Sequence, residues 1–510
     1  MEGPVGAFEI IDVDLAGRIA KLHLRNAKLE TPAFFPVIDP MRQELGLDLI
    51  AEAGFEQVIT NAYLAYKRYG PQPRGSIREL LGWRGIVMTD SGAYQILEYG
   101  DIGVTQDEIL LYQKEILKPD IGVILDVPTG DVSRLEAEKT VNETIRRSQE
   151  ALRVIDPTSD DVLWVLPIQG GRYLDLVEAS ARHAANSPYR MYGIGSPTVF
   201  LERYRYDTII DMILAAKRAL PPGRPVHLFG AGHPLIIPFA VALGVDTFDS
   251  ASYIIYARDG RYITEYGVYR VEDLDYLPCE CPVCSRYSPR ELAEMPREDR
   301  TRLLALHNLH VISKTLKRVK QAIREGRLWE LLEETARRHP AAYRALLKMR
   351  RAHSILETHT PRVKPRVRGL RLYGFESLWN PRLTRLRSRV LTHYLPERLK
   401  RLRPKRLILR PLPPSIEACK RGSSEDGYVV YYSPYLGLIP KELCGVYPTI
   451  HADYPHNYYQ DRVLKVLVSE IRAVLAIARR IGVEAEILGE PDSLCWILSR
   501  TVGGARCGGG

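Results

Sequence analysis

The chain has 510 residues, of which 45% are hydrophobic and 26% charged, and its net charge at pH 7 is +9. These values are typical of a folded globular protein and argue against disorder or a fibrous repeat. No apolar run approaches the ~18 residues of a membrane span. The first residues carry acids instead of the basic start of a signal peptide, so we expect a cytoplasmic protein.

The first 340 residues alternate between short apolar runs and amphipathic stretches, as strands and helices do around a parallel sheet. Each run is rich in β-branched or aromatic residues and is followed by Gly, Pro, Ser or Asp. The eight runs span residues 31–38, 57–63, 85–92, 120–128, 163–171, 190–196, 225–232 and 246–253. Helices are clearest over 134–153, where Ser133 can cap the first turn, and over 206–220.

Eight strands within about 220 residues predict an α/β protein with a closed (β/α)8 TIM barrel. A doubly wound open sheet is the alternative, although no GxGxxG motif follows the first strand.

Beyond the barrel the sequence predicts helices at 301–325 and 328–351, followed by an Arg/Pro-rich segment and a small α/β domain. We therefore expect a catalytic barrel at 1–345, a basic connecting segment at 346–406 and a C-terminal domain at 407–510. Within that last domain, the candidate elements are strands at 407–410, 428–432 and 484–488, a helix at 462–481 and a flexible Gly-rich tail.

The positive charge is concentrated in one segment. Residues 362–410 contain sixteen Lys or Arg and two acids, Glu376 and Glu397, so this segment carries +14 and the rest of the chain −5. A basic stretch on a mildly acidic protein is typical of binding to a polyanion such as nucleic acid. A solvated linker is the alternative, because the Arg–Pro texture would also suit one.

Polar residues follow the predicted strands at their carboxyl ends, which form the active-site face of a barrel. A single Asp in such a place is more often a turn or cap residue, but several that converge on one face predict a site. The candidates are Asp90, Asp126, Gln169, Gly195, Ser196 and Asp249.

Three carboxylates on one face suit chemistry at the anomeric carbon of a sugar. One can attack C1′ or stabilise an oxocarbenium-like transition state, while another moves a proton on the leaving group. The Gly-rich neighbours fit a flat ligand. The segment SGAY, which contains Ser91 and Tyr94, offers backbone N–H groups and an aromatic face. Asp and Gln side chains match the donor–acceptor edge of a purine, so we expect a nucleobase pocket.

The strongest local motif is PCECPVC with a downstream histidine. Cys279, Cys281 and Cys284 with His307 would make a closed tetrahedral zinc site, structural because no ligand position is left for water. His310, on the same predicted helix, is the alternative fourth ligand. Small apolar or surface roles are expected for the remaining cysteines, which are Cys419, Cys444, Cys495 and Cys507.

Taken in order, TDSGAYQ, LPIQGG, FDSASY, CxCxxC and LLALHNL resemble the tRNA-guanine transglycosylase family over residues 1–340. The sequence GSP at 195–197 and the long region after the barrel resemble the archaeal branch. That resemblance implies exchange of guanine 15 of tRNA for free 7-cyano-7-deazaguanine, preQ0, in archaeosine biosynthesis. It also implies one structural Zn²⁺ bracing an insertion at 279–307, and a homodimer.

The resemblance assigns roles as well. Asp249 is then the nucleophile and Asp90 the general acid and base. Asp126, Gln169 and Gly195 line the base pocket with Ser91 and Ser196, and Tyr94 stacks on the base. The segment 440–455 resembles part of the archaeal accessory region, with no catalytic role assigned to it.

One departure from the archaeal pattern concerns the end of the chain. Little sequence follows the small α/β domain, so we expect no PUA domain, and a separate PUA-type protein could anchor the tRNA acceptor end instead. Two other functions stay open. One is a queuine-type transglycosylase that acts on the anticodon loop. The other is a catalytically silent, zinc-bearing RNA-binding subunit, which the presence of both Asp90 and Asp249 argues against.

Overall fold

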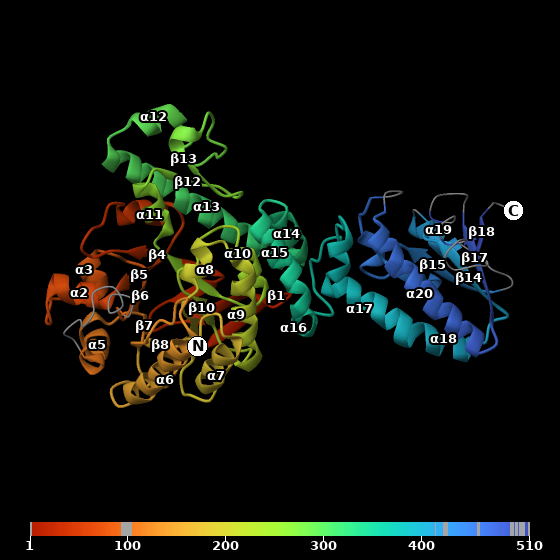
Figure 1. The fold of residues 1–510 in the computed structure, drawn as a ribbon, viewed down its shortest axis with the longest axis horizontal. Helices are drawn as coiled ribbons and strands as arrows, with labels where there is room; N and C mark the ends of the chain where they lie inside the picture. Colours follow the sequence, from red (N-terminus) through yellow and green to blue (C-terminus); the bar gives the residue numbers. More distant parts are fainter. Residues whose placement is uncertain are drawn as a thin grey trace. The chain divides into compact units, whose positions relative to one another are not determined.

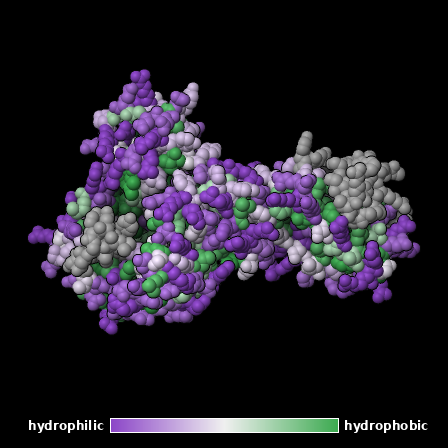
Figure 2. Space-filling model, in the orientation of Figure 1, coloured by the Kyte–Doolittle hydropathy of each residue, from purple (hydrophilic) through white to green (hydrophobic). Residues whose placement is uncertain are grey.

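The computed structural model describes residues 3–92, 105–413, 415–421, 427–455, 459–489, 494, 498 and 505–507. The chain divides into two compact units, Met1–Arg324 with Glu334–Ala352 and Glu325–Glu333 with His353–Gly510 (Figure 1). Among the described residues, no helix is long and apolar enough to cross a membrane. In the view of Figure 2, hydrophilic residues cover most of the coloured surface and hydrophobic ones appear in smaller areas.

The first unit is built around a closed barrel of eight parallel strands, which confirms the predicted TIM-barrel class. Neighbouring strands follow chain order around the barrel, and the last strand pairs with the first, Asp249 beside Phe35. The strands are β4 (Ala33–Ile38), β5 (Gln57–Asn61), β6 (Ile86–Asp90), β7 (Ile121–Val123), β8 (Leu163–Ile168), β9 (Met191–Ile194), β10 (Val226–Leu228) and β11 (Thr247–Ser250). Each lies within one of the eight predicted runs.

Helices between the strands surround the barrel (Figure 1). The two predicted most clearly are present as α6 (Arg134–Ala151) and α9 (Tyr206–Ala219), and the Ser133 hydroxyl accepts the backbone N–H of Glu136 at the start of α6. The others are α1 (Leu47–Glu52), α2 (Ala62–Tyr69), α3 (Ile77–Leu81), α5 (Gln106–Leu111), the π-helix η1 (Tyr112–Leu117), α7 (Leu174–Ala185), α8 (Thr198–Glu202), α10 (Ile237–Ala242) and α11 (Ser252–Arg258).

An N-terminal antiparallel sheet that the sequence did not predict precedes the barrel. It contains β1 (Phe8–Asp14), β2 (Gly17–His23) and β3 (Lys28–Thr31). Leu22 and Leu29 of this sheet share one buried cluster with barrel residues such as Met88. Arg18 forms a buried ion pair with Asp246, just before β11. The sheet therefore packs at the amino ends of the strands and leaves their carboxyl ends available for a site.

A cysteine-bearing insertion follows the barrel. It comprises the hairpin β12 (Arg261–Ile263) and β13 (Val268–Arg270), the 3-10 turn η2 (Val271–Asp273), α12 (Pro289–Glu294) and the long helix α13 (Arg297–Glu325). The predicted helix at 328–351 is divided into α14 (Leu328–Ala336) and α15 (Pro340–Met349), because Pro340 begins a new helix that the His339 side chain caps.

The second unit contains a five-stranded sheet of order β16-β15-β14-β17-β18. Its strands are β14 (Arg406–Pro411), β15 (Tyr428–Ser433), β16 (Gly437–Pro440), β17 (Glu484–Gly489) and β18 (Ala505–Cys507), all parallel to their neighbours except β16. The long helix α20 (Asp461–Arg480) packs its buried face into the same core as β14 and β15. The tail was predicted to be flexible throughout, which is wrong for 505–507, because these residues pair with β17.

Much of the basic segment is helical, whereas residues 361–374 contain no helix. The first unit ends with η3 (Arg350–Ala352). In the second unit, the short elements α16 (His353–His359) and η4 (Phe375–Trp379) are followed by α17 (Pro381–Arg389), η5 (Val390–Tyr394) and α18 (Leu395–Leu402). Arg387 is buried and pairs with Glu470, whereas Arg401, Arg403 and Lys405 are exposed. Part of the positive charge therefore stabilises this unit, and part of it faces solvent.

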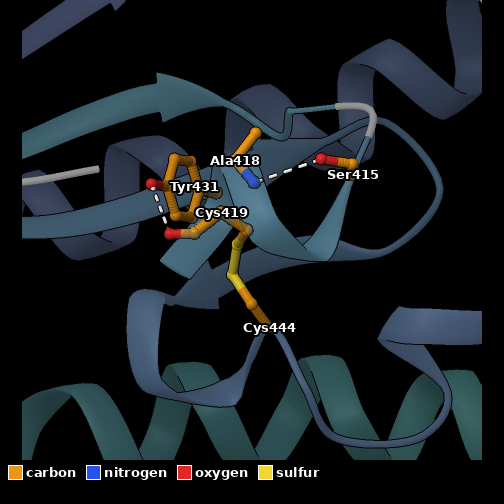
Figure 3. Close-up of a disulfide and its surroundings, with 5 residues drawn as sticks. All are labelled: Ser415, Ala418, Cys419, Tyr431 and Cys444. Carbon is orange, nitrogen blue, oxygen red and sulfur yellow. Dashed lines mark hydrogen bonds between the residues drawn. A yellow bond between two sulfur atoms is a disulfide. The ribbon is translucent and has the colours of Figure 1, made fainter. Parts of the chain in front are cut away.

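Cys419 and Cys444 form a disulfide across 25 residues, so the expectation that both are small unpaired residues is wrong (Figure 3). Cys419 lies in α19 (Ile416–Arg421), and its carbonyl accepts the Tyr431 hydroxyl of β15 at 3.0 Å. Cys444 follows the short turn η6 (Lys441–Leu443), and η7 (Thr449–His451) lies a few residues further on. Cys495 lies outside the described residues.

Candidate active site

A cavity of about 880 Å³ opens at the carboxyl ends of the barrel strands. That volume suits a nucleotide-sized ligand. Six of the predicted site residues line it, and they come from separate strands or the loops that follow them: Asp90, Asp126, Gln169, Gly195, Ser196 and Asp249. The convergence expected from a barrel is therefore present in the structure.

Asp90 is the last residue of β6. It is partly buried, and it lines the cavity. Burial, together with the negative charges of Asp126 and Asp249, raises the pKa of Asp90 to about 7. The Asn61 side-chain amide donates a hydrogen bond to Asp90 Oδ2 at 3.3 Å. A carboxyl group with such a pKa can both donate and accept a proton near neutral pH.

Asp126 and Gln169 form a fixed hydrogen-bonded pair. Gln169 Nε2 donates to Asp126 Oδ2 at 2.6 Å, and Gln169 Oε1 accepts from Ser196 Oγ at 2.8 Å and from the Thr129 backbone N–H at 3.0 Å. These partners fix the orientation of the amide. Burial raises the pKa of Asp126 to about 6, although the Gln169 bond opposes this rise. The carboxylate can accept N–H groups from a purine edge.

Ser196 has a positive φ of 60°, an uncommon conformation for a residue with a side chain. This conformation goes with a hydroxyl that bonds to Gln169 and to Thr129. Gly195 is adjacent, and a Cβ added there would overlap the Gln169 side chain. Only glycine therefore allows this close approach.

Asp249 lies in β11 and is 9% exposed. Its Oδ1 accepts two hydrogen bonds of 2.9 Å, one from the Gly230 backbone N–H and one from the His227 ring at Nε2. His227, in β10, was not among the predicted site residues. In the sequence it is one polar residue within the apolar run PVHLFGAG, and nothing local shows that it faces Asp249.

The two remaining predicted base-site residues do not contribute a described side chain to the cavity. Ser91 is fully buried, and its hydroxyl donates to the Ile124 carbonyl at 3.3 Å, in the barrel wall. Its backbone N–H donates a hydrogen bond to the Asp90 carboxylate, which partly opposes the rise in the pKa of Asp90. Tyr94 lies outside the described residues.

A second group of side chains converges in the insertion. Cys279, Cys281, Cys284 and His307 present ligand atoms that all lie within 4.8 Å of one another. Cys281 Sγ and Cys284 Sγ lie 3.4 and 3.3 Å from His307 Nδ1. His310 is not part of this group.

The neighbours of His307 orient it as a metal ligand. His307 Nε2 donates to the Ile263 carbonyl at 2.9 Å, which leaves the Nδ1 lone pair facing the thiols, and Tyr262 stacks on the imidazole at 3.7 Å. Such an outer hydrogen bond commonly selects the tautomer of a ligating histidine. Three thiolates and one imidazole are the donors of a closed tetrahedral site, so these residues fit a structural metal ion.

Comparison with known proteins gives concordant matches. The model of the family described as queuine tRNA-ribosyltransferase matches residues 14–341. A tRNA-guanine(15) transglycosylase of Aeropyrum pernix is 57% identical over 479 residues, 93% of each chain. One of Sulfolobus acidocaldarius is 46% identical over 463 residues, 90% of each chain. One of Pyrococcus furiosus is 44% identical over 361 residues, which are 70% of this chain and 61% of the relative.

Proposed function

The chain belongs to the tRNA-guanine transglycosylase family, and from that premise we propose that it exchanges guanine 15 of tRNA for free preQ0 through a covalent intermediate on Asp249. The relatives named for this position align with nine-tenths of the chain, including the second unit. The observation that carries the proposal is the shared cavity, where Asp249 and Asp90 lie beside a purine-compatible pair, Asp126 and Gln169.

In the first half of the reaction, the Asp249 carboxylate attacks C1′ of the target nucleotide. The C1′–N9 bond breaks and its electron pair leaves with guanine, which Asp90 protonates. An ester now joins Asp249 to the ribose. Asp90 suits this role because its pKa of about 7 leaves much of it protonated at neutral pH.

In the second half, the incoming 7-deaza base takes the place of guanine. It gives its N9 proton to Asp90, and N9 attacks C1′, which breaks the ester and regenerates Asp249. Two displacements give net retention at C1′. One glycosidic bond replaces another, so the two half-reactions are balanced without a further reactant.

We assign recognition of the base to Asp126 and to the residues that surround it in the cavity. The Asp126 carboxylate accepts N–H groups of guanine or preQ0, while Gln169 holds that carboxylate in place and Ser196 in turn holds Gln169. Gly195 also lines the cavity, and its lack of a side chain leaves room for Gln169, which a Cβ there would overlap.

We also propose that the metal of the insertion is one structural Zn²⁺ per chain, held by Cys279, Cys281, Cys284 and His307. When bound, it would cross-link the hairpin region to α13 and take no part in the exchange. A homodimer, with tRNA as the macromolecular substrate, completes the proposal.

The test is guanine exchange into tRNA with labelled base, followed by mapping of the labelled nucleotide. Label at position 15 supports the proposal, whereas label in the anticodon loop would establish the queuine-type activity instead. Complete lack of exchange would favour a silent RNA-binding role. Asp249→Asn should abolish both exchange and the denaturant-resistant enzyme–tRNA adduct, because the amide is a poor nucleophile of nearly the same shape.

A further inference from the structure

The buried histidine beside Asp249 has no role in the mechanism described above. His227 is fully buried in β10, and its ring packs edge-on against Phe229 with centroids 4.5 Å apart. Its two ring nitrogens each have one polar partner at 2.9 Å, Asp249 Oδ1 at Nε2 and Thr247 Oγ1 at Nδ1.

We propose that His227 is a positioning residue that holds the Asp249 carboxylate in the orientation needed for attack, with Thr247 selecting the tautomer that makes this possible. This inference rests on the proposed function, because it takes Asp249 as the nucleophile.

The geometry around the carboxylate distinguishes its two oxygens. Oδ1 accepts both the His227 and the Gly230 N–H groups. Oδ2 has no hydrogen-bond partner among the residues that the structure describes. Since Oδ1 is fixed by one side-chain donor, His227, and one backbone donor, Gly230, Oδ2 is the oxygen left to form the bond to C1′.

The tautomer follows from the partners of the ring. A neutral imidazole carries one N–H and one lone pair. If the Thr247 hydroxyl donates to Nδ1, the proton must be on Nε2, where it points at the carboxylate. Without that hydroxyl the proton could move to Nδ1, and the Nε2 lone pair would then face the negative charge of Asp249. Thr247 and His227 are register partners on β11 and β10, so the pairing of these strands keeps the hydroxyl beside the ring.

The surroundings explain why such a donor is needed. Asp90, Asp126 and Asp249 line one cavity, and three carboxylates at close range cannot all remain ionised without cost. The two N–H donors fix the Asp249 carboxylate in place for attack, while Asp90, whose pKa is raised by burial and by these neighbours, can hold a proton for the leaving base.

Two pairs of variants of the full-length enzyme test the inference. His227→Phe keeps a ring in a pocket that Phe35 and Phe229 already line, and removes both hydrogen bonds. His227→Gln restores an N–H near the position of Nε2. Thr247→Val removes only the hydroxyl, and Thr247→Ser restores it. The readouts are the single-turnover rate of the denaturant-resistant tRNA adduct, the affinities for tRNA and for guanine, and the melting temperature.

We expect His227→Phe to slow adduct formation on the order of 10- to 100-fold, the usual effect of losing one hydrogen bond to a charged group. The affinities for tRNA and guanine should stay within about twofold of the wild type, since only the reacting step is affected. His227→Gln and Thr247→Ser should recover most of the rate that their partner variants lose. This rescue, with unchanged binding, is not expected from a merely structural role.

Adduct formation at the wild-type rate in His227→Phe would overturn the inference. So would a rate loss in both His227 variants that follows the melting temperature, with no recovery by Gln. If His227→Phe failed to fold, a wild-type rate in folded Thr247→Val would overturn it equally, and a slow rate rescued by Thr247→Ser would support it. Wild-type enzyme that exchanges guanine with no adduct on Asp249 would instead refute the proposed mechanism itself.

Discussion

Gln169 Nε2 lies 2.6 Å from Asp126 Oδ2, at the side of the cavity assigned to the base. The bond engages one oxygen of Asp126 and leaves lone pairs on the other for a ligand. It also offsets part of the rise that burial causes in the pKa of Asp126, which stands at about 6. The amide therefore keeps Asp126 ionised at neutral pH, as an acceptor of purine N–H groups must be.

Gln169→Glu should reverse this effect. A second carboxylate would repel Asp126, so that one of the two holds a proton and the acceptor for the base is weakened. We expect guanine affinity, measured by calorimetry at pH 8, to fall on the order of 10- to 100-fold. Gln72→Glu makes the same change of charge at an exposed loop position and should leave guanine affinity unchanged. Unaltered affinity in Gln169→Glu would remove Asp126 and Gln169 from base recognition.

Asp90 predicts a pH-dependent stability. Because its pKa is about 7 in the folded protein and near 3.9 in the unfolded chain, folding favours its protonated form. The contribution of this group to the free energy of unfolding is fully present below about pH 4. It decreases as the pH rises through about 7, by up to a few kcal/mol in total. Asp90→Asn has no such loss, so its advantage in free energy of unfolding should be larger at pH 8 than at pH 5, although we expect this variant to be inactive. Denaturant unfolding at the two pH values measures this. An advantage equal at both would mean that the carboxyl pKa is not raised.

The part of the site that could be predicted depends on local signals. Several of the barrel strands are short apolar runs with a polar residue at or near their carboxyl end, and a closed parallel barrel brings those ends together whatever the details of packing. Asp90, Asp126 and Asp249 could therefore be assigned to one cavity from their order in the chain. The CxCxxC spacing likewise indicates a metal site from the sequence alone, although only the fold places His307 beside the three cysteines.

The features that the sequence did not predict depend on contacts between segments that are distant in the chain. His227 resembles any residue of a buried strand until the pairing of β10 with β11 places it beside Asp249. Strand β1, with several exposed positions and no clear alternation, has a weak strand pattern, and its pairing with β2 is what defines it. Cys419 and Cys444 are 25 residues apart with no motif around them, and only the fold of the second unit brings them together.

Two histidines on α13 offer a matched test of the metal site. His307→Ala should lower zinc content from about one equivalent per chain and reduce the melting temperature, because metal binding at a structural site contributes directly to folding. His310→Ala changes the same residue type three positions away and outside the ligand group, so it should retain its metal. Elemental analysis measures the zinc content of both variants, and calorimetry measures their melting temperatures. Equal zinc content in the two would mean that His307 is not a ligand.

The disulfide predicts a redox-dependent stability of the second unit. Closing a loop of 25 residues is worth about 3.5 kcal/mol through the entropy of the unfolded chain. Cys444→Ser should lower the free energy of unfolding by about that amount, and a reductant should lower that of the wild type to the same level. The double variant Cys419→Ser/Cys444→Ser is the control and should not respond to reductant. A wild type that is equally stable with and without reductant would show that the bond does not contribute.

The exposed cations in the last turn of α18 and just after it should bind the tRNA backbone. Exchange at a base in the tRNA core requires that base to leave its stack, which costs a few kcal/mol, and phosphate contacts elsewhere can offset this cost. Arg401, Arg403 and Lys405 are exposed, unlike Arg387, which the pair with Glu470 holds within the unit. Changing all three to Gln should weaken tRNA binding and reduce the slope of log affinity against log salt by about 2, near 0.7–0.9 per lost phosphate contact.

A matched variant makes this test specific. Lys139, Arg153 and Arg218 are exposed cations of the barrel unit, and changing them to Gln removes the same charge. If only general attraction mattered, the two triple variants would lose slope equally. We expect the barrel variant to keep the wild-type slope, and both to keep the affinity for free guanine, because the base cavity lies among barrel residues. Equal slopes in wild type and the Arg401/Arg403/Lys405 variant would show that this part of the basic segment faces solvent without contacting tRNA.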